Sequence, residues 1–154
     1  MKIYLGGSCA PEHRTMMHNI AEALRANDEN VYCPFELKIP NAWDYTQEEW
    51  ASKVFAADMH ELDSCDIFLM ISSGRESTAG TNFEQGYAYA LNKYIIVLQY
   101  TNVPTSLMTY MGAVIFKNST PETICDDAVA AVYEITHNYN LFYPPDTPCT
   151  TTLT

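Results

Sequence analysis

The chain has 154 residues, 47% of them hydrophobic and 18% charged, and its formal net charge is −11. This length and apolar content predict one folded domain with a sizeable core and exclude a disordered chain. With 8 basic residues against 19 acidic ones, the composition argues against a nucleic-acid or anionic-membrane partner, because phosphate backbones bind clusters of Lys and Arg.

The predicted elements alternate between short apolar strands and amphipathic helices. In chain order we expect a strand at residues 3–5, a helix at 11–26, a strand at 31–34, a loop at 36–45, a helix at 46–62, a strand at 66–72, a helix at 81–91, strands at 94–99 and 113–116, and a helix at 121–138. The tail from about residue 140 holds three prolines and is expected to be irregular.

Strands separated by helices predict a parallel sheet that is covered on both faces. We therefore expect residues 1–154 to form a single α/β domain with five parallel strands, flavodoxin-like or Rossmann-like. In such sheets, ligands bind outside the carboxyl ends of the strands. Three segments follow those ends: Gly6-Gly7-Ser8, residues 72–80 and residues 101–108.

The five cysteines form no Cys-x-x-Cys pair, and no His-x-x-x-His motif accompanies them. We therefore expect no metal and no cofactor, and the odd number of thiols fits a reduced, cytoplasmic protein better than a disulfide framework. Only three consecutive apolar residues precede the first glycines, too few for a signal peptide. No apolar run approaches the ~20 residues that a membrane-spanning helix needs.

The stretch from Ser77 to Gly86 is the most informative part of the sequence. Thr81 is a good helix N-cap and Glu84 follows three residues later, so one interpretation is a capping box in which Glu84 bonds back to the Thr81 amide. The other interpretation is a carboxylate kept ionised at the helix N-terminus by the helix dipole and able to attack a sugar carbon. These residues alone leave both interpretations open.

A second unusual carboxylate is Asp58, which shares one predicted helix face with Trp50, Val54 and Leu62. A carboxylate on an otherwise apolar stripe needs a partner or a task. It either makes a structural hydrogen bond or faces a cleft, where burial raises its pKa and suits it to proton transfer. Tyr4, beside the first glycines, is either a core residue or a site residue. The four histidines are scattered and form no catalytic grouping, so we interpret them as surface or core residues.

Five segments form a pattern along the chain: residues 2–7, 31–36, 50–58 with 66–70, 80–88 and 106–108. Their order and spacing resemble the nucleoside 2-deoxyribosyltransferase family, and the similarity runs to about Asn118. The resemblance implies an enzyme that breaks the bond between base and sugar by double displacement. It implies Glu84 as the nucleophile, Asp58 as the residue that handles the proton of the base, and Tyr4 as the residue that positions the nucleophile.

Candidate substrate contacts lie at the strand ends and in the loop before the second predicted helix. At the strand ends they are Gly6, Gly7, Ser8, Thr78 and Gly80. Trp43, in the loop, either stacks on the base or closes over it, or only packs within the loop. Ser106 and Met108 stand where the transferases reach into the site of a neighbouring subunit, so a homo-oligomer, dimer or larger, is expected.

Two positions depart from the transferase pattern. Thr78 stands where transferases commonly carry an Asp that binds the sugar 5′-hydroxyl, and Ser106 stands where they commonly carry an Asn. At both positions the chain is similar to a related branch, the nucleoside 5′-monophosphate N-glycosidases, in which small hydroxyl residues accept a phosphate. An anionic substrate requires that no carboxylate face its 5′ end.

Three hypotheses about function follow. The first is a transferase that moves 2-deoxyribose between free nucleobases, and the second is a hydrolase of 2′-deoxynucleoside 5′-monophosphates. The third is a non-catalytic nucleotide-binding module, because a fold does not fix a function. Residues 79–84 also resemble the motif of cytokinin-type phosphoribohydrolases, but the Pro-Gly-Gly that precedes that motif is missing here.

Overall fold

The computed structural model describes residues 1–138, and the irregular tail expected from about residue 140 lies outside the described residues. The strands are β1 (Lys2–Gly6), β2 (Asn30–Tyr32), β3 (Ile67–Ser72), β4 (Tyr94–Gln99) and β5 (Ile115–Asn118). The α-helices are α1 (Arg14–Arg25), α2 (Gln47–Ser64), α3 (Ala79–Ala90), α4 (Leu107–Met111) and α5 (Ile124–His137). None of the helices in this described part is long and apolar enough to cross a membrane.

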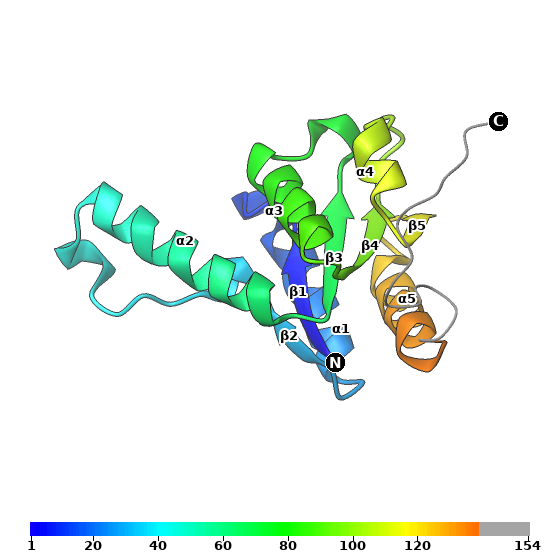
Figure 1. Cartoon of the computed structure of the whole chain (residues 1–154), viewed down its shortest axis with the longest axis horizontal. Coiled ribbons are helices and arrows are strands. Elements are labelled where there is room, and N and C mark those ends of the chain that lie inside the picture. Colours follow the sequence, from blue (N-terminus) through cyan, green and yellow to red (C-terminus); the bar gives the residue numbers. More distant parts are fainter. Residues whose placement is uncertain (139–154) are drawn as a thin grey trace.

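The five strands form one parallel sheet in the order β2-β1-β3-β4-β5 (Figure 1). This confirms the predicted five-stranded α/β fold, and the strand order is the flavodoxin-like one. The order of the strands reverses between β1 and β3, so the loops that leave these two strands diverge. Ligands of such folds bind in the crevice that this divergence opens at the carboxyl edge of the sheet.

Two helical layers cover the sheet. Helices α1 and α5 pack on the face that carries Ile3 and Leu5, whereas α2 and α3 contribute to the cluster on the opposite face around Tyr4, Phe68 and Met70. Successive residues of β1 therefore point to opposite layers, as the two-residue period of a strand requires. Tyr4 is consequently buried beneath the same two helices that carry the candidate carboxylates.

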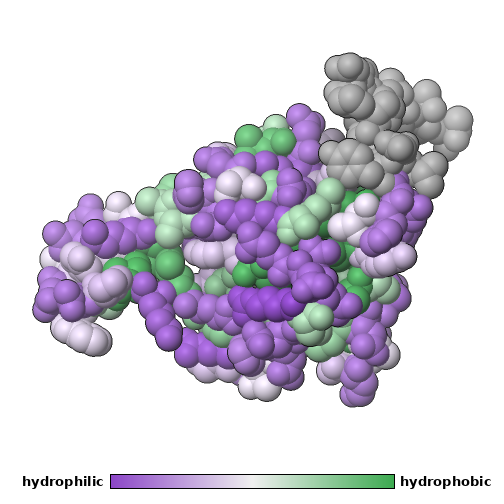
Figure 2. Space-filling view, turned by 90° about the horizontal axis from the view of Figure 1, so that it is seen from below, coloured by the Kyte–Doolittle hydropathy of each residue, from purple (hydrophilic) through white to green (hydrophobic). Residues whose placement is uncertain are grey.

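The amino-terminal half of α2 forms an arm that projects from the body of the molecule (Figure 1). Residues 47–53 are all exposed, and Leu62, near the other end of the helix, is its one buried residue. Seen from below, the arm is mostly hydrophilic, with apolar residues gathered where it meets the body (Figure 2). Helix α2 therefore packs against the body of the molecule mainly through its carboxyl-terminal half, which includes Asp58.

Several element boundaries differ from those predicted. The predicted helix from Pro11 opens with a single 3-10 turn, Pro11–His13, before α1. The predicted loop at residues 36–45 includes a 3-10 turn at Ala42–Asp44. Helix α4 was missed altogether, since residues 101–108 were expected only to follow a strand. The hydroxyl of Ser106 begins this helix by accepting a hydrogen bond from the Thr109 amide at 3.1 Å.

Candidate active site

Helix α3 carries Glu84 and begins two residues earlier than predicted. Its N-cap is Thr78, whose hydroxyl accepts a hydrogen bond from the Thr81 amide at 3.3 Å. The prediction that Thr81 caps this helix is therefore wrong, and so is the capping-box interpretation of Glu84. A capping box does occur in this chain, but it joins Thr46 and Glu49 at the start of α2.

A tyrosine of the sheet holds the Glu84 side chain by a hydrogen bond. The phenol of Tyr4 donates a hydrogen bond to Oε1 of Glu84 at 2.8 Å. Gly6 leaves room for the same carboxylate, because a β-carbon at that position would lie 3.2 Å from Oε2 of Glu84 and 2.7 Å from Cζ of Phe68. At Gly7, a β-carbon would instead lie 2.8 Å from Cε of Met17 in α1. Gly6 therefore leaves room for the Phe68 ring and the Glu84 carboxylate, and Gly7 leaves room for Met17 of α1.

A cavity of about 260 Å³ lies between α2 and α3. Its lining comprises Trp50, Ala51, Val54, Phe55, Asp58 and Met59 from α2 with Gly80, Phe83 and Glu84 from α3. The predicted stripe on α2 is thus largely in place, because Trp50, Val54 and Asp58 share this face while Leu62 is buried. The cavity volume lies slightly below the usual range for small-molecule pockets, about 300–1,000 Å³. The structure therefore brings the two candidate carboxylates, Glu84 and Asp58, to one mostly apolar cavity.

Burial dominates the electrostatics of both carboxylates. It raises the pKa of Glu84 from its ordinary value of 4.5 to about 7, while the Tyr4 hydrogen bond opposes that rise and the charge of Asp58 adds to it. Burial also raises the pKa of Asp58, against a hydrogen bond that the Tyr32 phenol donates to Oδ1 at 2.7 Å. Burial thereby moves the pKa of both carboxyls toward neutral pH, where either group can exchange a proton with a substrate. Near pH 7 about half of the Glu84 carboxyls are ionised and able to act as a nucleophile.

The raised pKa of Glu84 makes folding stability depend on pH. Between pH 4.5 and about 7 the folded chain binds a proton that the unfolded chain has released, so stability is lost as pH rises through this window. We expect Glu84→Gln to unfold with a free energy about 1–3 kcal/mol higher than the natural chain above pH 7, an advantage that disappears near pH 4. Urea titrations at pH 4 and pH 8 measure this difference.

Glu48→Gln is the matched control, because this substitution makes the same chemical change at an exposed position in the first turn of α2. It should lower the free energy of unfolding by at most about 1 kcal/mol, the usual contribution of a carboxylate in the first turn of a helix, and should not raise it at either pH. Equal stability of Glu84→Gln and the natural chain at pH 8 would contradict the proposed desolvation of the Glu84 carboxylate.

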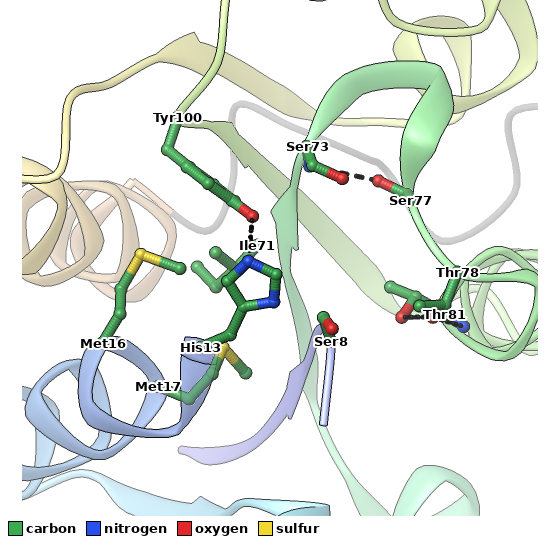
Figure 3. A pocket seen from close by; sticks show the side chains of 10 residues that line it. All are labelled: Ser8, His13, Met16, Met17, Ile71, Ser73, Ser77, Thr78, Thr81 and Tyr100. Carbon is green, nitrogen blue, oxygen red and sulfur yellow. Dashed lines mark hydrogen bonds between the residues drawn. The ribbon is translucent and has the colours of Figure 1, made fainter. Parts of the chain in front are cut away.

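A second, narrower pocket, which shares no lining residue with the first, lies where the loops after β1 and β3 meet the start of α3 (Figure 3). Its polar lining consists of the side chains of Ser8, His13, Ser73, Ser77, Thr78, Thr81 and Tyr100. Nε2 of His13 lies 3.3 Å from the hydroxyl oxygen of Tyr100, and the Ser73 amide donates to Oγ of Ser77 at 3.2 Å. The sequence singled out Ser8 and Thr78 here. No pattern in the sequence indicated that His13 pairs with Tyr100, because Tyr100 follows β4 and lies far from His13 along the chain.

Of the remaining predicted site residues, Trp43, Ser106 and Met108 line neither pocket, whereas Gly80 lines the larger one. Trp43 is 86% exposed on the turn before α2, and it lines neither pocket. Ser106 caps α4, where Met108 is 82% exposed, and neither contacts the two pockets. Gly80 does line the larger cavity, and a β-carbon there would meet no atom within 4 Å. Among the side chains that the structure describes, no three from His, Cys, Asp or Glu converge on a metal position.

The chain is thus a flavodoxin-like α/β protein in which two carboxylates, from two different helices, line one cavity. The family model for nucleoside 2-deoxyribosyltransferase matches residues 3–138, and the chain belongs to that family. This confirms the resemblance found in the sequence. None of the curated proteins with which the chain was compared matches it.

Solved structures share the fold at low sequence identity. A 2-deoxyribosyltransferase from the psychrotolerant bacterium Bacillus psychrosaccharolyticus is 23% identical, with a TM-score of 0.72 over 84% of this chain and 90% of that one. A CMP N-glycosidase of Clostridium botulinum is 15% identical, with a TM-score of 0.57 over 82% and 97%. A conserved protein from Enterococcus faecalis V583 is 17% identical, with a TM-score of 0.63 over 85% and 98%.

Proposed function

We propose that this protein is an enzyme that cleaves the N-glycosidic bond of 2′-deoxynucleosides and passes the sugar to another nucleobase. The observation that carries the proposal is the Glu84 carboxylate, bonded to Tyr4 and facing the cavity that Asp58 also lines. Membership of the nucleoside 2-deoxyribosyltransferase family supports glycosyl transfer or N-glycoside cleavage as the class of reaction. The larger cavity offers aromatic surface for a base, since the rings of Phe55 and Phe83 lie 6.3 Å apart along it.

In the first half of the proposed reaction, ionised Glu84 attacks C1′ of the sugar. The bond between C1′ and the base nitrogen breaks, its electron pair leaves with the base, and neutral Asp58 supplies a proton to that base. An ester between C1′ and Glu84 remains. Because Tyr4 occupies Oε1, the second carboxylate oxygen, Oε2, is the one left to attack. A carboxylate also stabilises the positive charge that develops on the sugar in the oxocarbenium-like transition state.

In the second half of the reaction, an incoming base attacks C1′ from the side that the first base left. The now ionised Asp58 accepts the proton that this base gives up, and the Glu84 carboxylate is released. Two displacements at the same carbon return the original configuration. Water in place of the base would give free 2-deoxyribose by the same steps.

The second, narrower pocket, lined by Ser8, Thr78 and other polar side chains, favours a second candidate function. This candidate is a hydrolase of 2′-deoxynucleoside 5′-monophosphates. None of the described side chains that line this pocket is a carboxylate, so nothing among them repels a phosphate. Thr78 and Thr81 lie at the N-terminus of α3, where the helix dipole and free amides favour an anion. A CMP N-glycosidase among the structurally similar proteins supports the same possibility.

We also propose that the enzyme is a homo-oligomer in which copies share their sites. Helix α4 exposes a row of large apolar side chains, Leu107 (73%), Met108 (82%), Tyr110 (51%) and Met111 (51%). Contiguous exposed apolar surface marks contact with another protein, and a twofold dimer is the commonest closure. A monomer in analytical ultracentrifugation that keeps full activity would contradict this proposal.

Product analysis separates the candidate functions. The protein is incubated with 2′-deoxyinosine or with its 5′-monophosphate, each with and without adenine, and the products are followed by chromatography. Formation of 2′-deoxyadenosine from the nucleoside is the expected result for the transferase. Release of hypoxanthine from the monophosphate alone, unaffected by adenine, would replace it with the hydrolase. Binding of either compound without turnover would favour the non-catalytic module.

A further inference from the structure

Tyr32 stands beside the proposed machinery, and neither the sequence nor the family resemblance assigned it a role. Its phenol donates a hydrogen bond to Oδ1 of Asp58 at 2.7 Å. We infer that Tyr32 is a positioning residue that holds one oxygen of Asp58 and thereby directs the proton of that carboxyl toward the base. The inference deepens the proposed function and rests on it.

The register of the sheet explains how Tyr32 reaches this place. Strands β1 and β2 are parallel, and Tyr4 and Tyr32 are partners in that ladder. Their side chains therefore leave the same face of the sheet side by side, with ring centroids 5.4 Å apart. Tyr4 bonds to Glu84 of α3, while Tyr32 bonds to Asp58 of α2. Each of two adjacent strands thus presents one phenol to one of the two carboxylates.

Helix α2 itself gives Asp58 little restraint. Its first seven residues are exposed, and Leu62 alone is buried among its residues. Asp58 and Tyr32 are each half-buried, so their hydrogen bond ties the middle of α2 to the edge of the sheet beside the cavity. A hydrogen bond to a carboxylate in such a partly buried, low-dielectric position is stronger than one exposed to water.

The direction of this hydrogen bond decides which oxygen of Asp58 can carry a proton. Burial and the Asp58 charge hold the pKa of Tyr32 well above its usual range, so the phenol remains a donor at every working pH. Oδ1 must then accept, and a proton on neutral Asp58 sits on Oδ2. The two oxygens acquire different tasks: Oδ1 anchors the side chain, and Oδ2 exchanges the proton with the base.

The charged and titratable groups near this pair come from several elements. They are Tyr4 on β1 and Cys9 in the loop after it, Cys33 directly after β2, Glu84 on α3, and Glu61 on α2. Tyr4 and Glu84 bond to each other. Tyr32 is accordingly the hydrogen-bond donor that the described residues provide to Asp58.

The first test needs no turnover. Carboxyl carbon NMR follows the titration of Asp58 in the natural protein and in Tyr32→Phe, which keeps the ring and removes the hydroxyl. We expect the pKa of Asp58 to rise in the variant, because the bond that favours its charged form is lost. Tyr87→Phe is the matched control, since it deletes a phenol–carboxylate bond of the same 2.7 Å length, to Asp63. It should leave Asp58 unchanged.

The second test measures turnover of 2′-deoxyinosine. Tyr32→Phe should lower kcat about 10- to 100-fold with KM nearly unchanged, and should cause no further loss in an Asp58→Asn background. An unchanged Asp58 titration overturns the inference whatever the activity, as does an equal loss from Tyr32→Phe with Asp58 present and absent. A natural protein that turns over no substrate contradicts the proposed function instead, and the NMR titration then still decides whether Tyr32 controls Asp58.

Discussion

Glu84→Gln is expected to lower kcat for 2′-deoxyinosine by about 10⁴-fold or more, the scale seen when a covalent nucleophile is removed. The amide keeps the shape of the side chain and an oxygen that can accept the Tyr4 hydrogen bond, which is 2.8 Å long in the natural chain. It has no negative charge with which to form an ester at C1′ or to stabilise an oxocarbenium-like sugar. Binding of the substrate, measured by calorimetry, should persist.

Trapping the intermediate tests the same role directly. Natural enzyme that is mixed with 2′-deoxyinosine and quenched in acid should carry one deoxyribosyl group on the peptide that contains Glu84, as mass spectrometry of a digest detects. Glu84→Gln should carry none, and Glu48→Gln, exposed on α2, should behave as the natural enzyme. Retention of more than about a hundredth of the activity by Glu84→Gln would contradict a nucleophilic role.

The pH profile should report the same carboxylate. Attack requires ionised Glu84, whose pKa is raised to about 7 by burial. With a substrate whose base already carries positive charge, such as 7-methyl-2′-deoxyguanosine, no proton from Asp58 is needed. The rate at low concentration of that substrate is therefore expected to fall as pH drops below about 7, although model carboxyls ionise near pH 4. The shifted limb distinguishes a buried nucleophile from the exposed carboxylates that dominate the surface of this acidic chain.

The sequence was sufficient to predict the sheet because its signals are local and repeated. Each strand is a short apolar run followed by a turn, and each long helix has a clear apolar period, so the alternation predicted five parallel strands. The order of the strands, which distinguishes flavodoxin-like from Rossmann-like folds, depends on contacts between distant segments. The register that sets Tyr4 beside Tyr32 is a contact of this kind.

The errors in the site arise from two local ambiguities and one contact between distant segments, none of which a single sequence resolves. Thr78 and Thr81 are both good N-caps, three residues apart, and the structure uses the first. The five residues after Ser106 are a leucine, two methionines, a threonine and a tyrosine, too short a pattern to distinguish a helix from a loop. The pairing of His13 with Tyr100 joins segments 87 residues apart. Asp58, by contrast, stood out as a carboxylate on an otherwise apolar stripe, and Glu84 was singled out by the family resemblance.

Asp58→Asn is expected to lower kcat for 2′-deoxyinosine by about 10²- to 10³-fold, because hypoxanthine leaves poorly unless it is protonated. The natural side chain suits that task, since burial raises its pKa and it lines the cavity with Glu84. A substrate whose base already carries positive charge, such as 7-methyl-2′-deoxyguanosine, needs no proton from the enzyme. With that substrate, the variant should approach the natural rate.

The comparison of the two substrates isolates proton transfer from the other effects of the substitution. A structural or binding defect lowers both rates equally, whereas loss of an acid lowers only the rate for the base that needs protonation. Asp63→Asn is the matched control. It alters an exposed carboxylate on the same helix, one that accepts a hydrogen bond from Tyr87, and it should change neither rate. Equal losses with both substrates in Asp58→Asn would show that Asp58 maintains the cavity without exchanging a proton with the base.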